Sequence, residues 1–498
     1  MSLTRKKSLA SLLAQAGDSE KGLKRTLGAG SLIALGIGAI IGAGLFVRTA
    51  LAAGENAGPA VTISFIIAAI GCAFAGLCYA EFASIIPIAG SAYTYAYATM
   101  GELTAWIIGW ALVLEYALGA ATVSISWSEY LNNLIVDFGG KGIPFEWCHS
   151  PWDDYKDAAG VLHSGIINLP ALFILILLTL LLIKGTHESA MVNAIIVVIK
   201  VSIVLVFIAV GWHFINPANH HPYIIPENAP PAIQPNGKPY DYTPFFNHGW
   251  AGVLKGAAVV FFAFIGFDAV STAAQEAKNP KRDMPIGILG SLMICTILYI
   301  LFSYVLTGVA PYTDFVRSGK EASVTYAIQT YMHGFGWLGT LVTLAILAGF
   351  SSVILVMLLG QSRVFFTMSQ DGLLPKVFCD LHPKFRTPYK SNLILFVFVG
   401  LFAGFVPGTV AGNLTSIGTL LAFVLVCIGV IILRKQDPNL VRPFKTPLVP
   451  LVPILGIIIC SAMILSLWGT TLTTAVVWML VGLVVYFGYS KNKSKLKV

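Results

Sequence analysis

The stretch that decides the fold is Gly36-Ile37-Gly38-Ala39-Ile40-Ile41-Gly42-Ala43-Gly44-Leu45-Phe46, which lies inside the first long apolar run of the chain. Glycine lacks a Cβ, so the backbone can leave helical geometry here at little steric cost. A later apolar run carries a similar interruption, Phe261-Phe262-Ala263-Phe264-Ile265-Gly266-Phe267-Asp268. The sequence therefore predicts two apolar helices, each broken near its middle.

Apolar segments long enough to cross a bilayer recur along nearly the whole chain. Of its 498 residues, 56% are hydrophobic and only 11% are charged, whereas a soluble domain carries about 25% charged residues. Each segment can cross roughly 30 Å of hydrocarbon. The fold class is therefore an all-α membrane protein of about twelve transmembrane helices. The expected spans lie near 29–53, 60–84, 103–131, 166–184, 191–214, 251–277, 286–310, 337–369, 391–408, 413–434, 450–468 and 472–490.

The net charge of +8 arises from basic clusters in alternate loops, which indicates membrane topology and argues against a nucleic-acid partner. With about twelve spans, all of these clusters fall on one side of the bilayer. The positive-inside rule then places both termini in the cytoplasm of a multi-pass cell-membrane protein. The clustered residues are Arg5, Lys6, Lys7, Lys21, Lys24, Arg25, Lys278, Lys281, Arg282, Lys376, Lys384, Arg386, Arg434, Lys435, Arg442, Lys445, Lys491, Lys493, Lys495 and Lys497.

The two interrupted spans are the first and the sixth, so each would open a repeat of five helices. An odd number of spans per repeat gives the two repeats opposite orientations, and paired broken helices in inverted repeats are typical of a transporter's binding site. The predicted organisation is a cytoplasmic N-terminal tail (1–28), a first repeat (29–214), an outer Pro-rich loop (215–250), a second repeat (251–434), two additional helices (450–490) and a basic cytoplasmic tail (491–498).

Unwinding a helix inside a bilayer exposes backbone groups that lipid cannot satisfy. A half-helix N-terminus presents roughly half a positive charge to a carboxylate, and freed carbonyl groups accept hydrogen bonds from an ammonium group. Together they suit the zwitterionic backbone of an amino acid. Close helix packing through small residues explains the first span equally well when it is taken alone. The matching interruption in the sixth span favours unwinding.

Several motifs resemble those of bacterial members of the cationic amino acid transporter family, within the amino acid–polyamine–organocation superfamily. The resemblance extends from about Leu27 to Tyr489. It implies a LeuT-type fold with twelve spans and two inverted five-helix repeats, and an activity of amino acid uptake that is often coupled to protons. The motifs are Gly36–Gly44, Tyr79-Ala-Glu-Phe-Ala83, Gly90-Ser-Ala-Tyr-Thr-Tyr95, Gly266-Phe-Asp268, Asn279-Pro-Lys-Arg-Asp-Met-Pro285 and Asp371-Gly-Leu-Leu-Pro375.

The resemblance also implies which backbone groups hold the substrate. Relatives usually have Thr or Ser between the last two glycines of the first motif, whereas this chain has Ala43, so a side-chain hydroxyl is absent there. The N–H groups expected to bind the substrate carboxylate are those of Gly42, Ala43 and Gly44. The carbonyl groups expected to bind its ammonium lie near Ile40, Ile41, Phe262, Ala263 and Ile265.

Met357 matches a family position at which a small residue leaves room for a long cationic side chain. Methionine is bulky, so the preferred substrate is expected to be a small or medium neutral amino acid such as alanine. Plain packing of a methionine in an apolar helix is the alternative interpretation. A carrier of cationic amino acids such as arginine or lysine is the corresponding alternative function.

Two ionisable residues lie deep in apolar runs, where an unpaired charge costs several kcal/mol. Lys200 interrupts the run 194–206. In the family the matching lysine faces the broken first helix, so a proton on Lys200 is expected to serve as the coupling charge. The alternative is a fixed cation that ties the first helix to the fifth. Glu115, in the third span, is either a second proton site or a counter-charge.

Other charged residues have structural interpretations. Asp268 is expected to position the second half of the sixth span, because aspartate is favoured at a helix start. Glu81 and Arg363 lie near cytoplasmic span ends and are expected to reach the interface. Arg48, in the outer half of the first span, is expected to face the outer vestibule and to deter cationic substrates.

Proton-coupled symport by alternating access is the main functional hypothesis, with an amino acid exchanger and a non-transporting amino acid sensor as alternatives. A membrane enzyme is disfavoured, because the spans contain neither a nucleophile–base arrangement nor a metal-ligand cluster. No cofactor is expected apart from the coupling proton. The expected partners are the amino acid and the lipid bilayer, and the sequence leaves a small accessory membrane subunit open.

Overall fold

The computed structural model describes residues 5–7, 27–86, 91–157, 159–185, 190–272, 277–317 and 323–495. Within this part of the chain, seven helices have the length and apolarity needed to cross a membrane, and five shorter apolar helices accompany them. The structure thus confirms an all-α membrane protein. Its apolar helices overlap the expected spans, but the outer half of the first span continues into the second as one stretch, Gly44–Ile85, and the third extends to Asp137, six residues beyond its expected end.

The first half of the chain forms these elements: α2 (Ala29–Ile40), η2 (Gly44–Arg48), α3 (Thr49–Ala52), η3 (Ala53–Ala57), η4 (Gly58–Ala60), α4 (Val61–Ile85), α5 (Ser91–Thr99), α6 (Glu102–Asp137), η5 (Phe145–Trp147), β1 (Asp154–Lys156), β2 (Leu162–Ser164), α7 (Leu169–Lys184), α8 (Ala190–Gly211), η6 (Trp212–Phe214), η7 (Pro217–His220) and η8 (Phe245–Asn247).

The second half forms α9 (Gly249–Val260), η9 (Phe261–Phe264), α10 (Ala269–Thr272), α11 (Pro280–Val309), α12 (Tyr312–Arg317), α13 (Ser323–Tyr331), α14 (Gly336–Gln370), η11 (Lys376–Phe378), α15 (Tyr389–Phe405), α16 (Gly408–Gln436), α17 (Leu451–Ser466), α18 (Thr470–Val485), η12 (Tyr486–Ser490) and α19 (Lys491–Lys493).

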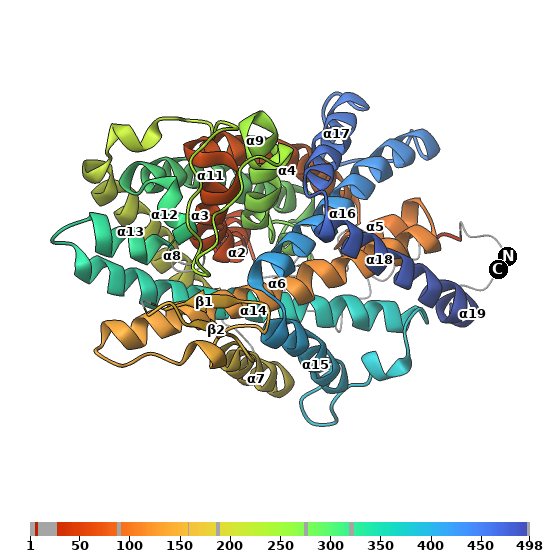
Figure 1. Ribbon diagram of the computed structural model, residues 1–498. Coiled ribbons are helices and arrows are strands. Elements are labelled where there is room, and N and C mark those ends of the chain that lie inside the picture. The colour runs from red at the N-terminus through yellow and green to blue at the C-terminus, as the bar shows by residue number, and fades with distance from the viewer. Residues whose placement is uncertain are drawn as a thin grey trace.

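Helices at equivalent positions of the two halves pack against one another. Helix α4 packs on α11, α6 on α14, and α7 on α15. The long helices α6 and α14 run side by side through the middle of the bundle (Figure 1). A two-fold relation between five-helix units would bring these pairs together, so the packing fits the inverted repeats that the sequence predicts.

The Pro-rich loop is tied to the end of the first span. The hydroxyl groups of Tyr240 and Tyr242 donate to the carbonyl groups of Glu55 and Gly54, at 3.1 and 2.8 Å. A two-stranded hairpin lies beside this loop, with β1 and β2 antiparallel and the N–H of Lys156 donating to Pro235. We call the membrane side that carries this hairpin and loop the loop face. Its irregular backbone is held in place by side-chain hydroxyl groups.

The described residues nearest to the two ends of the chain lie on the opposite side, which we call the terminus face. Lys7 lies 2.5 Å from Asp371 at the end of α14, and the Tyr93 hydroxyl donates to the same carboxylate. Near the other end of the chain, Ser494 donates to Glu102 at the start of α6. Lys7 and Ser494, which are separated by almost the full chain length, therefore pack on the same side of the bundle.

The expectation that Glu81 reaches the interface is wrong. Its side chain is fully buried, accepts two hydrogen bonds from Arg434 at 2.9 and 2.8 Å, and lies 3.2 Å from Arg442. The N–H of Thr446 donates to the same carboxylate. The paired arginines and the Thr446 N–H offset the cost of burying the Glu81 charge.

Candidate functional site

The first span breaks where its glycine motif predicts. Helix α2 ends at Ile40, and Ile41 has an extended backbone with φ −73° and ψ 107°. The helical path resumes at Gly44 with a π-helical turn. A helix cannot satisfy the N–H groups of its own first turn, so this restart presents donors, including those of Ala43 and Gly44, at mid-span.

The sixth span breaks beside the first. Helix α9 passes through the 3-10 turn η9, and Ile265 is then extended. Gly266 has φ +115°, a conformation that glycine adopts far more readily than other residues. A Cβ on Gly266 would lie 2.9 Å from the carbonyl carbon of Ala39, and one on Gly44 would lie 2.1 Å from the Cα of Ala263. The two breaks are therefore in backbone contact, and the glycines serve both unwinding and close packing.

Tyr299 of α11 joins the two breaks. Its hydroxyl group lies 3.0 Å from the carbonyl oxygen of Ile40 and 2.9 Å from that of Ala263. These are two of the carbonyl groups expected to bind the substrate ammonium. Both carbonyl oxygens lie within hydrogen-bonding distance of the same hydroxyl group, so they point to the same small volume. A hydrogen-bond donor, the Tyr299 hydroxyl, already occupies that volume.

Lys200 of α8 reaches the first break from the side. Its ammonium nitrogen donates to the carbonyl group of Gly38 at 2.8 Å, and the side chain is buried. The lysine stem lies against Gly349 of α14, where a Cβ would come 2.7 Å from the lysine Cε. Lys200 therefore lies between the half-helix α2 and the helix α14.

Glu115 lies beside a second carboxyl group, that of Asp268. The two carboxyl groups interact across the space between α6 and the second break, close to the Thr419 hydroxyl, and both side chains are fully buried. The neighbouring Tyr116 donates to Asp268 at 2.8 Å. The structure therefore brings an acidic residue of the third span beside one at the second break.

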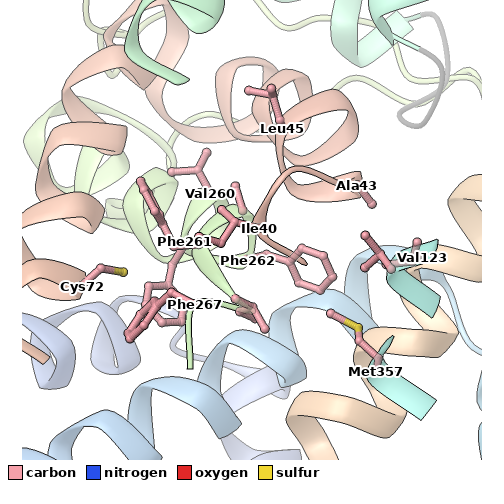
Figure 2. Close-up of a cluster of buried hydrophobic side chains, with 14 of the residues drawn as sticks. Ile40, Ala43, Leu45, Cys72, Val123, Val260, Phe261, Phe262, Phe267 and Met357 are labelled. Carbon is pink, nitrogen blue, oxygen red and sulfur yellow. The ribbon is translucent and has the colours of Figure 1, made fainter. Parts of the chain in front are cut away.

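The apolar wall of the site contains Phe262, Val123 and Met357. The ring of Phe262 points toward Val123 and Met357, with Ala43 nearby, whereas Phe261 and Phe267 point to the opposite side of the break (Figure 2). The sulfur of Met357 packs on Gly119, where a Cβ would come 2.8 Å from it. These side chains are buried in the interior of the bundle.

Comparisons with known proteins agree with this architecture. A family model described as "Amino acid permease" matches residues 27–489. The chain is 45% identical to the branched-chain amino acid permease BcaP of Bacillus subtilis, over 99% of both chains. The chain belongs to the amino acid permease family. It is also 40% identical to the methylthioribose transporter of Bacillus subtilis, over 99% of both chains. The BcaP permease of Lactococcus lactis is 32% identical, over 96% of this chain and 97% of that protein.

Membership of this family makes the chain a multi-pass membrane transporter rather than an enzyme, with an amino acid as its substrate class. In this permease, the predicted backbone groups of both breaks lie together, and Met357 and Lys200 approach them from α14 and α8. Glu115 is farther along α6, beside Asp268. The individual roles of these residues stay predictions.

Sequence reasoning missed Tyr299, and it missed the partners of Asp268. A buried tyrosine hydroxyl usually finds a hydrogen-bond partner, but the sequence around Tyr299 does not indicate which groups these are. Asp268 was expected to position the second half-helix, and its carbonyl group does accept the N–H of Ser271. Its side chain, however, is directed to Tyr116, 152 residues earlier in the chain.

Proposed function

We propose that the permease takes up neutral L-amino acids together with protons. The observation that carries this proposal is the hydrogen bond from Lys200 to Gly38, which places a buried proton-carrying group against the broken helix. A proton that arrives or leaves there changes the interaction that holds α2 to α8. Because alternating access moves one bundle of helices against the other, the protonation of Lys200 can be linked to the opening of the site.

The backbone groups at the two breaks support an amino acid as substrate. Donors at the start of η2 suit a carboxylate, and the carbonyl groups of Ile40 and Ala263 suit an ammonium. On binding, the ammonium would take over the position of the Tyr299 hydroxyl or share the carbonyl groups with it. Methylthioribose has neither an ammonium nor a carboxylate, so an amino acid uses these groups more fully.

The apolar wall supports a neutral side chain. Phe262, Val123 and Met357 offer dispersion contacts and no counter-charge for a cationic side chain. Alanine leaves part of this wall uncovered, whereas a branched aliphatic side chain covers more of it. The two relatives whose names specify branched-chain amino acids agree with the upper end of this size range. We therefore extend the proposed substrates from alanine to the branched-chain amino acids.

Uptake of labelled L-alanine and L-leucine into proteoliposomes with an imposed inward proton gradient tests this function. Accumulation that collapses with a protonophore is expected for both substrates. Unlabelled L-arginine and methylthioribose are added as competitors, and neither is expected to inhibit. Uptake only into vesicles preloaded with amino acid would identify an exchanger, and tight binding without flux would identify a sensor. Either result would overturn the proposal.

A further inference from the structure

Helix α7 presents an apolar stripe on the outside of the bundle. Its other side packs against α6 and α15, whereas Phe173 and Leu180 on the stripe are 57% and 60% exposed. The stripe residues recur at helical spacing, so they share one face of the helix. They line a cavity of about 380 Å³: Phe173, Ile176, Leu177, Leu180, Leu181 and Lys184. Such a surface on a membrane helix is covered by lipid chains or by another apolar helix.

The stripe carries a positive charge at one end only. Lys184 is the last residue of α7 and lies toward the terminus face. No lysine or arginine lies between residues 157 and 183, toward the loop face. A lysine at the end of a membrane helix keeps its methylene groups beside apolar side chains and extends its ammonium group into the interface. The cavity therefore combines an apolar length with a cationic end.

A tight turn brings a second cation to this end of α7. The hydroxyl group of Thr387 donates to the carbonyl group of Ile183 at 2.6 Å. Arg386 precedes Thr387, just as Lys184 follows Ile183. The turn is held by His382, whose N–H donates to Thr387 at 2.8 Å and whose carbonyl group accepts the N–H of Arg386 at 2.9 Å. Arg386 is exposed and has φ +55°, a conformation that few non-glycine residues adopt. Both basic residues are thus one position away from the same hydrogen bond.

We propose that α7 and this turn form a binding site for an anionic phospholipid. Its acyl chain lies along the stripe, and its phosphate contacts Lys184 and Arg386. The planar donors of a guanidinium group match phosphate oxygens, and each cation near the membrane surface strengthens the attraction to an anionic headgroup. We call the residues that line the cavity, together with Arg386, the lipid site.

Charge distinguishes an anionic lipid from other occupants of the stripe. In the described part of the chain, the carboxylate of the same loop, Asp380, pairs with Lys390 at 2.7 Å, and neither Lys184 nor Arg386 forms an ion pair. A zwitterionic lipid would bring a further cation toward these two. A second copy of the chain, related by a two-fold axis along the membrane normal, would bring its own Lys184 and Arg386 to the same depth. An anionic headgroup instead neutralises the charges.

A phosphatidylglycerol with a diazirine in one acyl chain tests the lipid site in the full permease. After irradiation in detergent, mass spectrometry identifies the labelled peptides. Labelling is expected between residues 173 and 181. Unlabelled phosphatidylglycerol should suppress this labelling at concentrations about tenfold or more below those needed for phosphatidylcholine with the same chains. Inorganic phosphate should not suppress it, because the proposed site binds the chain and the headgroup together.

Variants separate the headgroup contact from the cavity. The double variant Lys184→Gln, Arg386→Gln removes both charges and should reduce labelling about tenfold or more. Leu180→Trp fills the cavity and should also reduce labelling, with both charges in place. Lys435→Gln is the matched control, because it removes an exposed cation from the terminus-face end of α16. This control should label normally. Thermal unfolding confirms that each variant is folded.

Several results would overturn the inference, and none of them depends on which substrate the permease carries. Equal competition by phosphatidylcholine, or normal labelling of the double variant, would show that the two charges do not select the lipid. An equal loss of labelling in Lys435→Gln would show attraction by the basic surface as a whole. Competition by inorganic phosphate would identify a phosphate site without a lipid. Normal labelling of Leu180→Trp, or no label on α7, would show that the stripe does not hold the chain.

Discussion

The ammonium nitrogen of Lys200 lies 2.8 Å from the carbonyl oxygen of Gly38, so helix α8 donates a hydrogen bond into the last turn of the half-helix α2. A neutral amine can still donate one hydrogen bond, but without the charge that strengthens it. The contact is therefore weaker after deprotonation. The change in the strength of this hydrogen bond would allow the protonation state of Lys200 to influence the position of α2.

Variants of Lys200 distinguish its two possible roles, coupling transport to protons and holding the first helix to the fifth. Lys200→Met removes both the charge and the donor, and it should abolish proton-driven accumulation of alanine. Lys200→Arg keeps a donor and a charge that cannot be lost. If coupling needs a proton to leave, the arginine variant should exchange internal for external alanine but not accumulate it. Accumulation at the normal level by Lys200→Arg would show that the residue is only a tether.

Adding a methyl group at Gly44 should disrupt the contact between the two breaks. In Gly44→Ala, the new Cβ would meet the Ala263 backbone at 2.1 Å, and backbone cannot move aside as a side chain can. We expect a loss of more than about 3 kcal/mol of stability, or misfolding, and loss of uptake. Gly30→Ala in α2 is the matched control, because nothing lies within 4 Å of its Cβ position. Thermal unfolding in detergent that is equal for the two variants would contradict this account.

The buried carboxylate of Glu81 should contribute strongly to stability. Glu81→Gln leaves Arg434 and the buried Arg442 without their anion, which typically costs about 3–5 kcal/mol. Asp380→Asn is the control, since its partner Lys390 and Asp380 itself are both 43% exposed and such pairs contribute about 0–1 kcal/mol. Thermal unfolding compares the two variants. Equal decreases in unfolding temperature for the two variants would mean that the ion pair of Glu81 with Arg434 does not stabilise the packing of α4 on α16.

His149 on the loop face should remain charged over the physiological pH range. Burial disfavours its charged form, but Glu129, 2.7 Å away, and Cys148 outweigh burial and raise the pKa of His149 to about 11. Because the pKa is higher in the folded than in the unfolded state, the stabilisation is complete below about pH 6.5, falls progressively as the pH rises, and is gone above about pH 11.

His149→Gln should therefore lower the unfolding temperature at both pH 6 and pH 8, and by less at pH 8, where part of the stabilisation has already been lost. The same is expected for Glu129→Gln, and the double variant should be little worse than either single one. Thermal scans over this pH range make the comparison. An effect of His149→Gln that disappears between pH 6 and pH 8 would show that the histidine titrates normally.

The breaks could be predicted from sequence because glycine clusters in apolar runs reflect local backbone requirements. Lys200 could be singled out from sequence as a residue with a special contact, because a lone cation in an apolar run is costly unless it finds a partner. The Tyr116–Asp268 and Glu81–Arg434 contacts could not be predicted, because they depend on how helices 152 and 353 residues apart pack together. Arg48 donates a hydrogen bond to Asn413 and lies beside the Phe262 ring, contacts that likewise become apparent only once three spans are assembled.

The most direct test of the account is to follow the internal pH of proteoliposomes when external L-alanine is added without an imposed gradient. A pH-sensitive dye trapped inside reports proton movement, while labelled alanine reports entry of the substrate. The account predicts that the interior acidifies as alanine enters, and that Lys200→Met abolishes this acidification. Alanine entry with no change of internal pH would contradict proton coupling.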